Sequence, residues 1–149
     1  MAGLLFRATP GDVSLSAATA KTVLQIIAPT NQRVLIRSLR VTFAGTNPVA
    51  APATIRVLRQ TTAGTVTSLT LVKDNNSDDE TLQSTAGYNA TAEPTASDVL
   101  ETYRCHTQSG IIVDFPWNSP LIAKGGSRIG IEITSTEAVT CNICAKCEE

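Results

Sequence analysis

The side chains with the most distinctive chemistry are four cysteines and a single histidine. Cys141, Cys144 and Cys147 form a C-x-x-C-x-x-C run, a spacing that resembles part of a zinc or iron–sulfur ligand set. On a strand, the two-residue period would place Cys141 and Cys147 on one face and Cys144 on the other, so one metal could not collect all three. A fourth ligand is also absent nearby, because the remaining options, Cys105 and His106, are remote in sequence. We therefore favour buried thiols, with an intersubunit disulfide or a weak metal site as the alternatives.

His106 would have to serve any mechanism that pairs a nucleophile with a histidine base, because the chain has no other histidine. It follows Cys105 on a predicted strand, where neighbouring side chains point to opposite faces, and the sequence has no G-x-S-x-G turn. The expectation is a protein that is not an enzyme and has no cofactor.

An acidic run imitates the start of a calcium-binding loop, with Asp74, Asn76 and Asp78 at alternate positions. The sixth position of such a loop requires glycine and the twelfth requires glutamate, but they hold Asp79 and Thr85. We interpret the run as a solvated acidic loop.

The elements that position these residues are predicted to be strands, because β-branched residues are abundant and turn residues recur between short apolar runs. A chain of 149 residues buries about 70% of its unfolded surface, enough for one core spanning residues 1–149. The expected fold is an all-β antiparallel β-sandwich of the jelly-roll type. The predicted strands are 4–9, 13–18, 22–28, 33–44, 53–61, 68–72, 99–107, 110–115, 127–134 and 138–147.

Two of these strands have informative patterns. Ile129, Ile131 and Ile133 alternate with Arg128, Gly130, Glu132 and Thr134, which predicts one buried and one solvated face. In the segment 33–44 the apolar positions shift from Val34 and Ile36 to Leu39, Val41 and Phe43. A bulge near Arg37 and Ser38 would restore one buried face, as occurs where a strand crosses between sheets.

Two segments have a further interpretation. Residues 1–10, which contain the predicted strand 4–9, are also interpreted as an N-terminal arm, with Leu4, Leu5 and Phe6 as interface candidates. Residues 73–96 form a long loop excursion, a feature that in compact domains is usually functional or disordered. Phe115 and Trp117 flank a proline and are candidates for an interface hot spot or for a cap on the end of the sandwich.

Charge and hydropathy exclude several partners. The net charge is −1, which provides no basic field for nucleic acid, and no apolar run approaches the length of a membrane span. The order of charge and apolar residues at the N-terminus does not fit a secretory signal, so synthesis in a cytoplasm is expected.

The succession of segments resembles small structural proteins of tailed bacteriophages. The segments that carry the resemblance are Ile27–Val34, Leu58–Thr65, Ala92–Thr95, Phe115-Pro116 and Gly125–Ile131. Proteins of this type look like capsid decoration, or cement, proteins, which are often trimeric jelly-roll units on the capsid exterior. The resemblance implies a virion protein that contacts the major capsid protein and copies of itself, with the arm of residues 1–10 reaching a capsid neighbour. The alternative is a carbohydrate-binding or tail- or head-fibre adhesion module.

Overall fold

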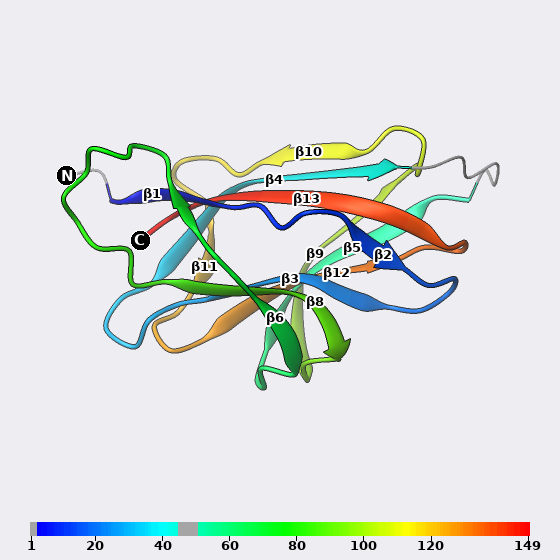
Figure 1. Cartoon of the computed structure of the whole chain (residues 1–149), viewed down its shortest axis with the longest axis horizontal. Coiled ribbons are helices and arrows are strands. Elements are labelled where there is room, and N and C mark those ends of the chain that lie inside the picture. The colour runs from blue at the N-terminus through cyan, green and yellow to red at the C-terminus, as the bar shows by residue number, and fades with distance from the viewer. Residues whose placement is uncertain (1–2, 45–50) are drawn as a thin grey trace.

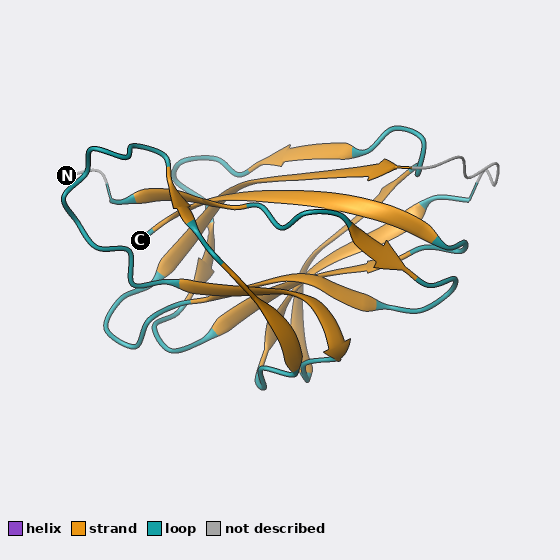
Figure 2. Ribbon diagram, viewed as in Figure 1, coloured by secondary structure: helices purple, strands orange, loops and turns teal. Residues whose placement is uncertain are grey.

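The chain folds as two antiparallel β-sheets packed face to face, which confirms the predicted all-β antiparallel sandwich. The structure is a computed structural model and describes residues 3–44 and 51–149. Figures 1 and 2 show the two layers, in which loops and turns connect the strands. Within the described residues, no helix is long and apolar enough to cross a membrane.

Among the described residues, one layer is a seven-stranded sheet with β13 (Val139–Glu148) near its centre. On one side β13 pairs with the long strand β4 (Val34–Ala44), and on the other it pairs with β1 (Leu5–Ala8) and β2 (Val13–Leu15). The edges are formed by β10 (Ile111–Asp114) and β11 (Leu121–Ala123) beside β4, and by β7 (Val72–Lys73) beside β1.

The second layer is a sheet of six strands within the described part of the chain. Their order across the sheet is β6 (Thr65–Leu69), β8 (Thr85–Ala92), β3 (Lys21–Ile27), β12 (Arg128–Thr134), β5 (Ala53–Gln60) and β9 (Ala96–Cys105). Consecutive strands often change layer, since β3, β5 and β12 lie in this sheet and β2, β4 and β13 in the other.

The core lies between the layers and is built mostly from branched aliphatic side chains. In β12 the alternation is as predicted on the inner side, where Ile129, Ile131 and Ile133 are fully buried. They face β4 and β13 across the core, where Ile36 and Ile143 are equally inaccessible. β-branched side chains suit both the strand backbone and this packing, which explains why these segments form a sandwich.

The predicted bulge in β4 is confirmed. Ser38 pairs with Lys146 and Ile36 pairs with Cys147, so Arg37 is an extra residue that β13 does not match. The bulge places Ile36 and Leu39 on the buried side, both at 2% exposure or less. The strand does not cross between layers as such bulges sometimes allow, because β4 pairs with β13 on both sides of Arg37.

The strand predicted at 4–9 is confirmed, whereas the free N-terminal arm and the unbroken loop over 73–96 are not what the described residues form. Residues 5–8 form β1, which pairs with β13 on one side and β7 on the other, so they are not a free arm. Residues 85–92 form β8, which pairs with β3 and β6, so the loop is confined to the parts before and after that strand. β8 consists mostly of small residues and has no alternation of large apolar side chains, so the sequence did not predict this strand.

The outer side of the six-stranded sheet is not the solvated face that the alternation in β12 predicts. Gly130 and Glu132 point to that side and are both buried. The side chain of Gln60 lies directly over Gly130, where a Cβ would fall only 2.3 Å from its Cδ. Glycine therefore leaves room here for the Gln60 amide, and any side chain at this position would displace that amide.

Two connections of the chain cover this side. The β5–β6 and β8–β9 connections are joined by a hydrogen bond from Thr61 N to Thr95 O at 2.9 Å. Beneath them, Gln25 Nε2 donates to Gln60 Oε1 at 2.6 Å, and Gln60 Nε2 donates to Thr22 Oγ1 at 3.0 Å. The centre of the six-stranded sheet thus has a covered outer side, whereas the described residues provide no such cover for the seven-stranded sheet.

Candidate interaction surface

The uncovered outer side of the seven-stranded sheet, here called the open face, is organised by strand register into two rows. One row runs from Asp114 on β10 through Ser38 on β4 and Lys146 on β13 to Arg7 on β1. The next row contains Ile112 on β10, Arg40 on β4 and Cys144 on β13. Residues within a row are cross-strand neighbours and therefore point to the same side of the sheet.

Large apolar side chains are exposed on this side of the molecule. Ile112 is 61% exposed, Val72 at the β7 edge 63%, and Trp117 in the turn after β10 69%. Ile122 on β11 adds a smaller area at 39%. Two shallow hollows of about 260 and 300 Å³ lie next to one another here and share Ser38, Asp114 and Lys146. Exposed apolar area rimmed by charges is typical of a surface that binds a partner.

Arg37 connects Trp117 to the sheet. Its guanidinium lies 4.0 Å from the centre of the indole ring, and its Nη1 donates to the Trp117 carbonyl oxygen at 2.8 Å. The same guanidinium donates through Nε to Glu148 Oε2 at 2.7 Å, and Glu148 Oε1 also accepts from Gly3 N at 3.0 Å. Because the bulge in β4 supplies Arg37, it indirectly holds the exposed indole in place.

A second charged group lies near the β1 end of the same side. Asp74 Oδ1 accepts from Arg7 Nε at 2.7 Å, and Asp74 Oδ2 lies 3.2 Å from Lys146 Nζ. The hydrogen bond from Arg7 lowers the pKa of the Asp74 carboxyl below its usual range. The first position of the apparent calcium loop is therefore engaged in fixing β1 to the strand before the acidic run.

Replacing Asp74 by asparagine should reduce stability by roughly 0.5–1 kcal/mol at neutral pH, since Arg7 is half exposed and the pair is partly screened. A depressed folded-state pKa gives stability that is present above the ordinary aspartate pKa of about 4 and is lost as pH falls through the lower folded value. Urea unfolding between pH 6 and pH 2 should show a smaller acid loss in Asp74→Asn than in the native chain. Equal acid losses in both would contradict the pairing.

The cysteine run has the predicted alternation. Cys141 and Cys147 are fully buried in the core, whereas Cys144 lies on the open face and is partly accessible. Burial raises the pKa of Cys141 to about 12 and also raises that of Cys147. Cys144 Sγ instead accepts a hydrogen bond from Thr9 Oγ1 at 3.2 Å. The strand does not bring the three sulfurs together, and the described residues contain no cluster of metal-ligating side chains.

Cys105 and His106 lie in different local surroundings. Cys105 ends β9 and is buried, which raises its pKa. His106 begins the following turn, where its Nδ1 accepts a hydrogen bond from Gln108 N at 3.2 Å. The histidine helps to shape a turn, in keeping with its position just beyond the strand.

The predicted interface residues divide into two groups. Leu4 and Phe6 point inward and are 6% and 0% exposed, so they belong to the core of their own chain rather than to a contact with a neighbour. Leu5 and Phe115 are half-buried, and Trp117 is exposed. Leu5, Phe115 and Trp117 line the same hollow on the open face. The sequence therefore indicated part of the surface but missed Ile112, Ile122 and Val72.

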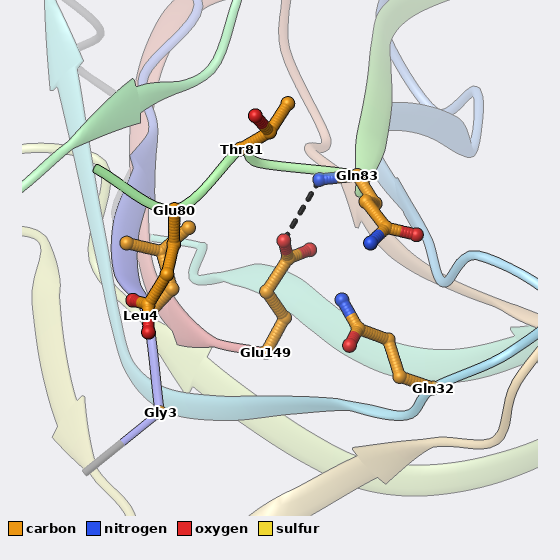
Figure 3. A pocket seen from close by; sticks show the side chains of 7 residues that line it. All are labelled: Gly3, Leu4, Gln32, Glu80, Thr81, Gln83 and Glu149. Atoms are coloured by element: carbon orange, nitrogen blue, oxygen red, sulfur yellow. Dashed lines mark hydrogen bonds between the residues drawn. The ribbon is translucent and has the colours of Figure 1, made fainter. Parts of the chain in front are cut away.

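A further hollow, of about 420 Å³, lies at another end of the sandwich (Figure 3). Its lining is polar, and Glu149 occupies its centre. The Glu149 carboxylate accepts from Gln83 N and Ser84 N, both at 2.8 Å, and also from the Ser84 hydroxyl. This carboxylate holds the segment before β8 against the end of β13, and its acceptor sites are used within the chain.

Comparisons with known proteins do not assign the chain to a family. No protein-family model matches the chain, and no curated protein or solved structure matches it. The class that the structure defines is an antiparallel β-sandwich with one covered and one open outer side.

Proposed function

We propose that the protein is a structural virion component that decorates and stabilises a bacteriophage capsid, binding the major capsid protein and copies of itself as a trimer. The observation that carries this proposal is the asymmetry of the two outer sides. The chain covers the centre of the six-stranded sheet with its own connections, while Ile112, Trp117 and Ile122 stay exposed over the other sheet. A binding module requires such a surface, and none of the clusters described above resembles a catalytic centre.

The strand order supports the finer jelly-roll interpretation. β1 and β2 pair with β13, which pairs with β4, which pairs with β10 and β11, while β3, β12, β5 and β9 follow one another in the opposite sheet. Paired Greek keys of this kind define jelly rolls, which are common in viral capsid and lectin domains. Fold alone does not select between them, so the choice rests on the exposed surface and on the resemblance of the sequence.

A carbohydrate-binding or fibre adhesion module is the second candidate, and the exposed indole of Trp117 favours it. Sugars bind to aromatic faces, but Arg37 already lies over the ring of Trp117 at 4.0 Å. A sugar would therefore have to use the opposite ring face, and no other aromatic residue is exposed among the described large hydrophobic side chains.

The test is cosedimentation of the purified chain with shells assembled from the major capsid protein encoded in the same genome. We expect saturable binding that weakens by roughly 30-fold in Trp117→Ala, as for an interface hot spot. The matched control is Val99→Ala, at the β9 edge of the other sheet and 48% exposed, which should bind as the native chain does. A chain that stays monomeric at micromolar concentration and does not bind shells would refute the proposal. Glycan-array binding that Trp117→Ala abolishes would instead favour the adhesion module.

A further inference from the structure

Two charged side chains on the open face have opposite signs and no partner. In the described residues, the guanidinium of Arg40 and the carboxylate of Asp114 make no ion pair or hydrogen bond, although both are exposed. Within the two rows of the open face, the other charges are satisfied by the chain itself. Arg7 and Lys146 share Asp74, and Arg37 is paired with Glu148. Among the described residues of the two rows, Arg40 and Asp114 are thus the charges without a partner.

Register places these two charges at opposite corners of a four-residue patch. Asp114 pairs with Ser38, and two residues further along Ile112 pairs with Arg40. One diagonal of the patch joins Arg40 to Asp114, and the other joins Ile112 to Ser38. The exposed Ile112 thus stands between the free charges, next to the hollow of about 300 Å³ that Arg40 and Asp114 also line.

This pattern is complementary to itself. A two-fold axis that lies parallel to the sheet, along the diagonal from Ile112 to Ser38, exchanges the ends of the other diagonal. Each Arg40 then faces Asp114 of the second copy, and the two Ile112 side chains meet on the axis. Such a contact is isologous, because the same residues contribute from both sides.

We propose that two copies of this chain pack through the Ile112 patch with this two-fold symmetry. A simple anion is a poorer occupant because Asp114 repels it, and a cation is repelled by Arg40 in the same way. The inference rests on the proposed function, because it assumes that the open face binds other copies of the chain. It specifies one of these contacts. A two-fold contact pairs two copies, and it can link neighbouring trimers that form through other surfaces.

The charge pairing is tested by reversal and rescue. Arg40→Asp and Asp114→Arg should each weaken dimerisation in sedimentation equilibrium by about tenfold or more, because each places like charges opposite one another. The double variant Arg40→Asp with Asp114→Arg restores opposite charges across the axis and should regain an affinity within about threefold of the native chain. The inference would be overturned if either single variant dimerised as tightly as the native chain, or if the double variant dimerised as weakly as the single variants.

The position of the axis is tested by an engineered thiol. In a Cys144→Ser background, Ile112→Cys should form a disulfide-linked dimer with oxidised glutathione as the oxidant, since residue 112 meets its symmetry mate. Val72→Cys is the matched control, because it has nearly the same exposure on the same sheet but lies at the opposite edge. Equal cross-linking of both variants, or of neither, would overturn the inference. Cosedimentation of Arg40→Asp and Asp114→Arg with capsid shells separates the two proposals. Variants that no longer dimerise but still bind shells would show that the dimer contact and the capsid contact are distinct.

Discussion

Replacement of Phe6 by alanine should lower the free energy of unfolding by about 3–5 kcal/mol, a large part of the 5–15 kcal/mol typical of a domain. Phe6 is fully buried, and its strand neighbours on both sides, Cys147 on β13 and Lys73 on β7, fix its position. A side chain of this size leaves a cavity that surrounding aliphatic groups fill only partly. Urea denaturation of the isolated chain measures the loss.

The control for Phe6 is its neighbour Leu5, which points to the opposite side of β1 and is half-buried. Leu5→Ala should cost less than half as much as Phe6→Ala. The comparison also distinguishes the observed strand, which the sequence predicts at 4–9, from the alternative interpretation of a free N-terminal arm. A mobile arm would make both substitutions silent in the isolated chain, and in that case the pairing of β1 with β13 would not hold in solution.

Replacement of Glu148 by glutamine should destabilise the chain by about 3–5 kcal/mol, because it leaves the buried cation of Arg37 without a counter-charge. The two side chains are only 11% and 9% exposed, so water does not compensate for the loss. Removing both charges is less harmful than removing one. The double variant Arg37→Met with Glu148→Gln should therefore lose less stability than the sum of the two single variants.

The exposed pair between Arg59 and Asp98 is a control for this cycle. These side chains are 50% and 70% exposed and their nearest N and O atoms are 3.4 Å apart, so Asp98→Asn should change stability by less than about 0.5 kcal/mol. If Glu148→Gln had as small an effect, solvent would have to reach Arg37 far more freely than the structure indicates. Thermal unfolding followed by circular dichroism is sufficient for all four variants.

The fold could be predicted wherever side-chain periodicity carries the information. The isoleucines of β12 alternate strictly, and the shift of apolar positions in β4 located the bulge at Arg37. β8 was missed because the segment TAGYNATA contains small and polar residues in every position except one, and such residues are also typical of loops. β11 was missed because three residues are too few to show a period.

The candidate site was harder to predict because it depends on which strands become neighbours. Trp117 is conspicuous in a sequence with one tryptophan, and it is exposed as a contact residue should be. The pairing of Arg37 with Glu148 joins residues 111 positions apart, and only the register of β4 against β13 brings them together. The inward turn of Phe6 was equally hidden, since an apolar run near a terminus is compatible with an arm or with an added strand.

The central position of β13 has a consequence for how the molecule is made. β1, β2 and β4 all pair with this strand, yet residues 139–148 emerge from the ribosome after the other three. Until then one layer lacks its middle, and the apolar sides of the early strands have nothing to close against. Folding dominated by such distant contacts is slow, so we expect this layer to close only after the last strand has been synthesised.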